Sequence, residues 1–268
     1  MVSLASCEAT YPARAIVPQL ARLIKEEINL NATCRVSGKT LWVYLPLEDL
    51  VENDKVSWNA PGLEKVNKAI GVVHRVVLSS DADLDFAAVV GADVKKYGVA
   101  ITVIEYVPDF KEAVYEKFSR GEFFARNVRD VNVNPETVGD LTGETMNTYD
   151  ISFSHFLGLQ ILSRTRNIFA KDKTLSRIFE VKSVSQSEKF GIIRLEFEFT
   201  KKTYDLSAEE EAIRPLDTAA MVVALVIRNY NYEDFQQIVL IDTFADANVK
   251  FTPEAIRKIK IKLPRIDE

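Results

Sequence analysis

The chain has 268 residues, of which 47% are hydrophobic and 27% are charged, and its formal net charge is −5. This composition is typical of a folded protein, and the length suits one large domain or two domains of about 130 residues each. The negative charge argues against a general nucleic-acid-binding protein, because neutralising phosphates requires a basic surface. No apolar stretch of the sequence reaches the roughly 18 to 20 residues that a membrane-spanning helix needs.

The N-terminal residues contain a short pattern that ends in a cysteine. Leu4-Ala5-Ser6-Cys7 resembles the lipobox of bacterial lipoproteins, in which small residues precede a cysteine that is lipidated and becomes the mature N-terminus. The six residues before Cys7 contain neither the basic region nor most of the apolar region of a signal peptide. The resemblance implies a lipid on Cys7, a membrane of the bacterial cell envelope as a partner, and residues 1–12 as a tether. The alternative is a chance match in a cytoplasmic protein.

The first half of the chain predicts helices that alternate with pairs of strands. Apolar residues at helical spacing predict helices over 12–28 and 63–77, and Pro61 suits the first turn of the second. Runs of β-branched and aromatic residues predict strands over 32–36, 41–45, 86–90 and 99–106. A further helix is expected to start at Pro108, and a short one to cover 123–128.

A polar segment, 133–147, follows these elements. It contains Pro135, Gly139 and Gly143 and few large apolar side chains, which is typical of a boundary between domains. The sequence therefore predicts a first half over 13–132, a linker over 133–147 and a second half over 148–268.

The second half repeats the order of the first. Its predicted elements are a helix over 151–170, strands over 175–184 and 190–200, a helix over 215–228, strands over 235–243 and 249–251, and a final helix capped by Thr252. The first strand pair is expected to turn at Gln186-Ser187-Glu188. Apolar residues alternate with charged ones from Ile193 to Phe199, which predicts a strand with one face in water.

These patterns predict an α+β fold of antiparallel sheets with helices packed on one face, built from repeated helix-strand-strand units. The order of elements favours the interpretation that the second half is a duplication of the first, and it also resembles a circularly permuted ferredoxin-like fold. Residues 86–90, 101–104 and 238–241 are apolar on both strand faces, which predicts burial on both sides. An apolar groove for a lipid is the alternative interpretation.

The acidic run Asp81, Asp83 and Asp85 is a weak candidate for a metal site, because it resembles the start of an oxygen-ligand calcium loop. The pattern departs from that loop at its sixth and twelfth positions, where Phe86 and Ala92 replace glycine and glutamate. A solvated connection between helix and strand is the simpler interpretation, and the sequence predicts no bound metal and no cofactor.

Other residue types that carry chemistry are sparse. His74 and His155 each lie beside an apolar helical stripe, which favours packed, hydrogen-bonded histidines over catalytic ones. Cys34 lies in a predicted strand and is expected to be a small buried hydrophobe. The sequence therefore indicates no catalytic residue.

Aromatic residues near the first predicted hairpin are weak candidates for a binding surface. Trp42, Tyr44 and Trp58, with Tyr97 and Tyr106, could present such a surface to a partner, although aromatic side chains on strands commonly belong to a core.

Taken together, the patterns favour a non-catalytic envelope lipoprotein that acts as a binding or scaffold module for a protein partner. Two alternatives stay open: a soluble enzyme whose site is assembled from residues distant in sequence, and a protein that binds a lipid or another apolar ligand.

Overall fold

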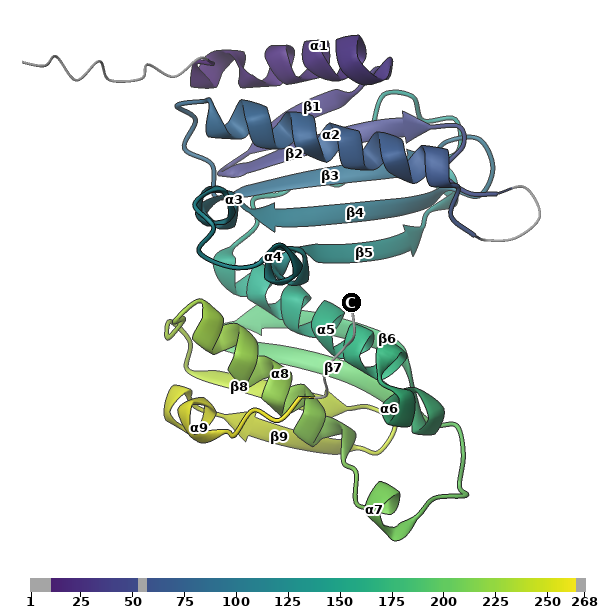
Figure 1. The fold of residues 1–268 in the computed structure, drawn as a ribbon, viewed down its shortest axis with the longest axis vertical. Helices are drawn as coiled ribbons and strands as arrows, with labels where there is room; N and C mark the ends of the chain where they lie inside the picture. The colour runs from purple at the N-terminus through teal and green to yellow at the C-terminus, as the bar shows by residue number, and fades with distance from the viewer. Residues whose placement is uncertain (1–10, 53–56, 264–268) are drawn as a thin grey trace, which may run out of the picture. The chain divides into compact units, whose positions relative to one another are not determined.

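The computed structural model describes residues 11–52 and 57–263, and the chain divides into two compact units, Met1–Ile151 and Ser152–Glu268. Each unit combines a sheet with helices on one of its faces (Figure 1), which confirms the predicted α+β class. No helix in the described part of the chain is both long and apolar enough to cross a bilayer.

The first unit contains five strands and four α-helices among its described residues. In chain order they are α1 (Ile16–Ile28), β1 (Thr33–Ser37), β2 (Thr40–Leu47), α2 (Ala60–Leu78), β3 (Phe86–Asp93), β4 (Val99–Tyr106), α3 (Val107–Val114), α4 (Arg120–Arg126) and β5 (Val128–Val133). Short 3-10 helices cover Ala13–Ala15 and Pro135–Thr137. Capping residues set the bounds of two of these helices. Asn29 ends α1 in a left-handed conformation, and the Ser119 hydroxyl caps the start of α4.

The strand order of the first sheet is β1-β2-β3-β4-β5. The pairs β1–β2, β3–β4 and β4–β5 are antiparallel, whereas β2 and β3 are parallel and are joined through α2. This topology contradicts the analogy with a permuted ferredoxin-like fold, because a split βαβ unit places another strand between the two strands that the helix joins. Here those two strands are adjacent.

One face of this sheet packs against α1 and α2, which lie over β1 to β3 in Figure 1. Leu41, Val43 and Leu45 of β2 point into this layer and are completely buried, and Val73 of α2 packs among them. The helices supply apolar stripes at 3.6-residue spacing, so the hydrophobic core forms where these stripes meet the alternating apolar residues of the strands.

The opposite face of the same sheet is covered by the segment 134–151, which follows β5. The indole N–H of Trp42 donates to the carbonyl oxygen of Tyr149 at 2.8 Å, and the carboxylate of Asp150 accepts the backbone N–H of Lys39 at 2.9 Å. Met146 is also buried. The predicted linker 133–147 is therefore wrong: this segment contains few large apolar residues, yet it packs on the first unit.

The second unit has four strands and five α-helices within its described residues. They are α5 (Phe153–Lys171), α6 (Lys173–Ile178), β6 (Phe179–Lys189), β7 (Ile192–Lys201), α7 (Ala208–Glu211), α8 (Pro215–Asn229), β8 (Gln237–Asp242), β9 (Ala247–Phe251) and α9 (Pro253–Lys258). The sheet order is β6-β7-β8-β9, again with a parallel central pair, β7–β8, between antiparallel neighbours. This repeats the topology of β1 to β4, while a common origin of the two units stays a prediction.

The sheet of the second unit has one apolar and one polar face, as the alternation in β7 predicts. Ile193, Leu195 and Phe197 are buried beneath the helices, whereas Arg194 is exposed and Glu196 is half-buried on the other face. Val239 in β8 is also buried, although it shares the polar face with Arg194. The prediction of burial on both sides of 238–241 therefore holds for Val239, while Ile241 is only partly buried.

Two predicted elements are wrong in their bounds. The hairpin of the second unit turns at Phe190 and Gly191, whose φ angles are 53° and 72°, and not at 186–188. Residues Leu175 to Ile178 belong to α6, because the Asp172 side chain accepts the N–H groups of Thr174 and Leu175 and starts a helix there.

Candidate functional site

Cys7, the predicted lipidation site, lies outside the described residues, as does most of the predicted tether 1–12. The first described residue, Tyr11, donates its N–H to the carbonyl oxygen of Ser79 at 3.0 Å. The described chain therefore begins on the folded part, at the end of α2.

Trp42 and Tyr44 do not form the predicted aromatic surface. Their exposed fractions are 3% and 1%, because both lie beneath the segment 134–151. Trp58 is 36% exposed and forms an isolated β-bridge with Val51. The three side chains therefore do not combine into one binding site, and alternation along β2 is the reason: Trp42 and Tyr44 point to the covered face of the sheet.

The acidic run between α2 and β3 has protein partners. The ammonium group of Lys39 lies 3.0 Å from the carboxylate of Asp83 and 3.7 Å from that of Asp85. Asp81 accepts the backbone N–H of Ala13 at 2.5 Å. The Lys39 ammonium therefore occupies the position where a cation would bind. Within residues 11–52 and 57–263, no group of three potential ligands among Asp, Glu, His and Cys could hold a metal ion.

Cys34 is 9% exposed, and burial raises the pKa of its thiol to about 12. A thiol with such a pKa stays protonated at neutral pH and is a poor nucleophile. This agrees with the predicted role of a small buried hydrophobe.

A buried polar cluster joins α2, β4 and the residue that follows α4. The imidazole Nε2 of His74 lies 2.6 Å from a carboxylate oxygen of Glu105, and the amide of Asn127 donates to the other oxygen at 2.5 Å. Glu105 is 2% exposed, and the His74 ring packs beside the rings of Phe110 and Phe123. Both carboxylate oxygens are thus bonded, and the imidazole is held in one orientation beside a carboxylate.

An ion pair lies on the neighbouring helices α3 and α4. The Arg126 guanidinium is 3.0 Å from the carboxylate of Asp109 and 3.0 Å from that of Glu122, and it lies over the ring of Phe118. Only 12% of the Arg126 side chain and 5% of the Asp109 side chain are exposed. A buried charge needs such partners, so these contacts fix α4 against α3. The His74–Glu105 pair can hold a proton in one position, and the Arg126 contacts hold the two helices together. The charged and polar groups of both clusters bond to other groups of the same protein.

The second unit has a comparable cluster at the start of α5. The amide of Gln186 donates to the carbonyl oxygen of His155 at 3.0 Å and lies 2.9 Å from its imidazole Nδ1. Burial lowers the pKa of His155, and the nearby carboxylate of Glu188 opposes this shift. Ser154 donates a short hydrogen bond to Glu188. The histidine is therefore packed and bonded, as its place beside an apolar stripe predicts.

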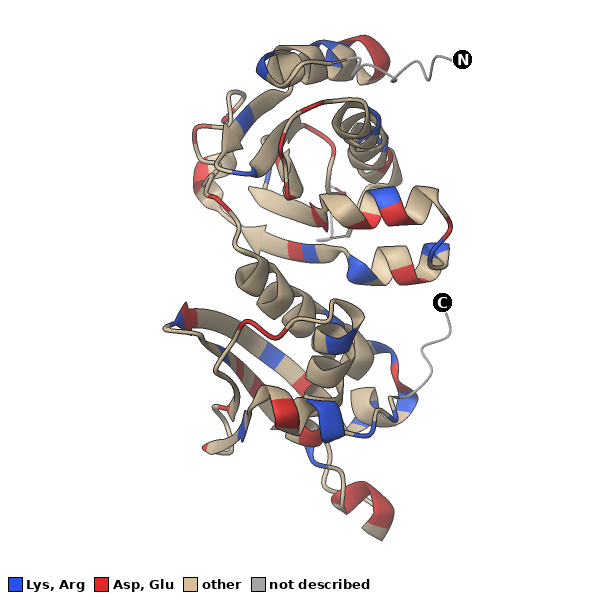
Figure 2. Cartoon of the chain, turned by 90° about the vertical axis from the view of Figure 1, so that its left-hand side faces the viewer, with Lys and Arg blue, Asp and Glu red and all other residues tan. Residues whose placement is uncertain are grey.

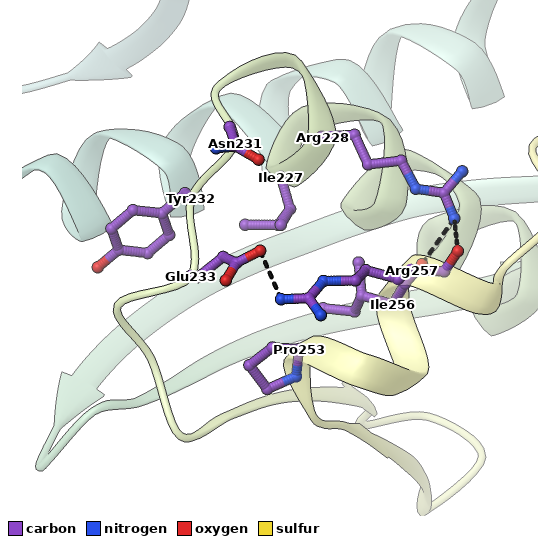
Figure 3. A pocket seen from close by; sticks show the side chains of 8 residues that line it. All are labelled: Ile227, Arg228, Asn231, Tyr232, Glu233, Pro253, Ile256 and Arg257. Carbon is purple, nitrogen blue, oxygen red and sulfur yellow. Dashed lines mark hydrogen bonds and ion pairs between the residues drawn. The ribbon is translucent and has the colours of Figure 1, made fainter.

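A small cavity of about 200 Å³ lies where α8, the loop that follows it and α9 meet (Figure 3). Arg228 donates to the carbonyl groups of Ile256 and Arg257 at the end of α9 and to that of Ile259, which follows the helix, at 2.6 to 2.8 Å. The Glu233 carboxylate pairs with the Arg257 guanidinium at 2.5 Å on the rim. These contacts dock α9 against α8, and the volume is below the roughly 300 Å³ typical of ligand pockets.

The strand β5 forms an open edge of the first sheet. Five of its six residues are exposed, and Val131 and Val133 have exposed fractions of 50% and 64%. In Figure 2, β5 is tan except for one adjacent blue and red pair, Arg129 and Asp130. A long exposed edge with apolar side chains is a ready template for pairing with another strand.

Backbone geometry shows which groups of β5 face outward. Asn134 donates its N–H to the carbonyl oxygen of Gly98, so the alternate residues Asn132 and Asp130 are the hydrogen-bonded partners of β4. The N–H and C=O groups of Arg129, Val131 and Val133 therefore point away from β4. Their side chains lie on the sheet face that carries the helices, since Val131 is opposite Ile101 of the core.

Searches against protein-family models, curated proteins and solved structures find no match to this chain. The fold and its surfaces alone define the class: an α+β protein of two similar helix-strand-strand-helix-strand-strand units.

The sequence did not predict two features of the first unit: the polar cluster of His74, Glu105 and Asn127, and the open edge of β5. Glu105 lies 31 residues from His74 and 22 from Asn127, so spacing along one element does not bring them together. A glutamate within an otherwise apolar strand was the available signal, because a buried carboxylate requires a partner. The edge strand β5 was the second omission.

Proposed function

We propose that this chain is a non-catalytic binding or scaffold module, held at a membrane of the bacterial cell envelope by a lipid on Cys7. The observation that supports a binding role is the open edge of β5, with three outward-facing backbone residues and two exposed valines. A protein segment in extended conformation would satisfy these backbone groups by adding a strand to the sheet.

The proposed tether follows from the lipobox-like Leu4-Ala5-Ser6-Cys7. A lipid on a single cysteine, followed by the polar residues Glu8 to Thr10, would hold the folded part at the membrane surface. Two acyl chains or more are needed for stable anchoring, since one gives only marginal membrane binding.

The tether is tested by expressing the natural gene of this chain in its own cells. The parent chain should sediment with the membranes, and mass spectrometry should find acyl chains on Cys7 as the mature N-terminus. Cys7→Ser should move the chain to the aqueous fraction. A parent chain that is aqueous and retains the residues before Cys7 would rule out the tether and restore the cytoplasmic alternative.

The binding role is tested by a photo-crosslinking amino acid at Val133, with the same amino acid at Val36 as the matched control. Val36 is an exposed valine on β1, the other edge strand of the same sheet, with an exposed fraction of 45%. Irradiated cells should yield a discrete protein adduct from position 133 that is absent from position 36. Equal yields at the two positions, or no adduct at 133, would contradict the role of β5.

A further inference from the structure

The outward edge of β5 is complementary to itself. Because the outward residues alternate, an added strand can bond only to Arg129, Val131 and Val133. Each of these residues offers one N–H and one C=O, which makes three donors and three acceptors. The edge therefore has as many donors as acceptors, as an edge that pairs with a copy of itself must.

We propose that the partner at this edge is a second copy of this chain, paired through antiparallel β5 strands about a two-fold axis at Val131. The proposal deepens the binding role proposed above and is independent of the lipid on Cys7. The two five-stranded sheets would then form one continuous ten-stranded sheet. Two-fold dimers of this kind are the commonest closed assemblies of a single chain.

The register follows from the backbone groups. With the axis at Val131, Val131 pairs with its own copy and Arg129 pairs with Val133 of the second copy. Every outward N–H and C=O of the three residues is then bonded. An axis at Asn132 places Arg129 opposite Pro135, which has no N–H to donate. An axis at Asp130 places two aspartates directly opposite each other, which is destabilising, and leaves Val133 without a strand partner.

The side chains fit the same register. On the face that carries the helices, the two Val131 side chains meet at the axis, and Val133 packs beside the aliphatic part of Arg129 from the second copy. On the other face, Asp130 lies opposite Asn132, whose amide can donate to a carboxylate. No two like charges are directly opposite, and the exposed apolar area of both valines is buried.

The test uses the full chain with Cys7→Ser, which removes any lipid and leaves Cys34, whose thiol is buried. Sedimentation velocity over a range of concentrations should show a monomer–dimer equilibrium. Val131→Lys should raise the dissociation constant at least about tenfold, because two ammonium groups would face each other at the axis. Val36→Lys, the same exchange on β1, should leave the constant within about twofold of the parent.

Cysteine pairing tests the register without disturbing the fold. Residues in a hydrogen-bonded antiparallel pair have Cα atoms about 5.5 Å apart, within disulfide range. Val131→Cys should therefore form a dimer by itself under mild oxidation. Val133→Cys should crosslink poorly alone but efficiently when mixed with Arg129→Cys. Circular dichroism of each variant shows that it is folded.

A parent chain that stays monomeric, or equal effects of Val131→Lys and Val36→Lys, would overturn the self-pairing. Efficient crosslinking of Val133→Cys alone would overturn the register. These failures are distinguishable from failure of the proposed function: an adduct from position 133 to a different protein would keep the binding role while excluding a second copy as the partner.

Discussion

The phenol of Tyr44 donates a hydrogen bond to the backbone carbonyl oxygen of Asp140 at 2.9 Å. This contact joins the centre of β2 to a segment almost one hundred residues further along the chain, and it explains why β2 is apolar on both faces. Burial raises the pKa of Tyr44 to about 12, so its hydroxyl keeps its proton and remains a donor over the whole neutral range. The face that a lipid groove would require is therefore occupied by residues of the same unit.

Gly143 tests how closely this segment packs on Tyr44. A Cβ atom at Gly143 would lie 2.9 Å from ring atoms of Tyr44, and the φ angle of 72° disfavours any other residue. We expect Gly143→Ala to lower the free energy of unfolding by about 2 to 4 kcal/mol in urea titrations.

Gly139→Ala is the matched control. Its φ angle is 86°, but an added Cβ meets nothing within 4 Å. Only the backbone strain should therefore lower the free energy of unfolding, by about 1 kcal/mol. Equal losses for the two variants would mean that the segment yields to the added methyl group and is not closely packed on Tyr44.

Asp140 predicts a dependence of stability on pH. Burial alone raises the pKa of its carboxyl, but hydrogen bonds from the Thr145 hydroxyl and from the backbone N–H groups of Thr145, Thr142 and Glu144 lower it well below the ordinary 3.8. The unfolded chain therefore takes up this proton first as the pH falls. The stability due to Asp140 is present above its ordinary pKa and is lost as the pH falls toward its folded value.

Asp140→Asn should accordingly be less stable than the parent at neutral pH, because an amide nitrogen cannot accept the Thr145 bonds. The difference in the urea midpoint should shrink as the pH falls below about 4, where the parent also loses its contribution. A difference that stays constant between neutral and acidic pH would show that the charge of Asp140 is not what the bonds stabilise.

Calcium should not stabilise the chain. Lys39 already pairs with Asp83 and Asp85, and a divalent ion would have to displace this ammonium group. Thermal unfolding should give the same midpoint, within about 1 °C, with excess calcium or with chelator, both for the parent and for the Asp83→Asn, Asp85→Asn double variant. A calcium-dependent rise that the double variant loses would instead establish the acidic run as a metal site.

The long helices were predicted well from the sequence, because their apolar stripes are strong local signals, whereas the short α6 was predicted as part of a strand. The predicted helices 63–77 and 215–228 agree with α2 and α8 within a few residues. The edge strand β5 was not predicted, since five of its six residues are exposed and apolar and polar residues alternate only over Val131-Asn132-Val133. The turn at Phe190 was also missed, because a bulky residue at a φ of 53° is uncommon.

The covered face of the first sheet shows a different limit of sequence reasoning. Residues 134–151 form no strand and no α-helix, so no periodic pattern indicates that they pack on Trp42 and Tyr44. The doubly apolar strands did predict burial on both sides, but they could not indicate which part of the chain covers the second face. The same holds for the His74–Glu105 pair, whose members lie on different elements.

His74 and Glu105 offer the clearest test of whether the buried polar cluster has a structural role. Removing His74 leaves the Glu105 carboxylate, whose side chain is 3% exposed, with the amide of Asn127 as the hydrogen-bond donor that remains to it in this cluster. We expect His74→Ala to lower the free energy of unfolding by about 3 to 5 kcal/mol, the usual result of removing one partner of a buried pair.

The double variant His74→Leu, Glu105→Leu removes both polar groups and keeps an apolar side chain beside Phe110 and Phe123. If the pair has a structural role, this variant should recover most of the stability lost by His74→Ala, because two apolar groups of similar size can replace a buried pair at little cost. Urea titrations of the parent, of His74→Leu, of Glu105→Leu and of the double variant give the coupling between the two residues. If the double variant is as unstable as His74→Ala, the buried Asn127 amide, left without the Glu105 carboxylate, itself costs much of the stability. The cluster would then act as one network of three residues.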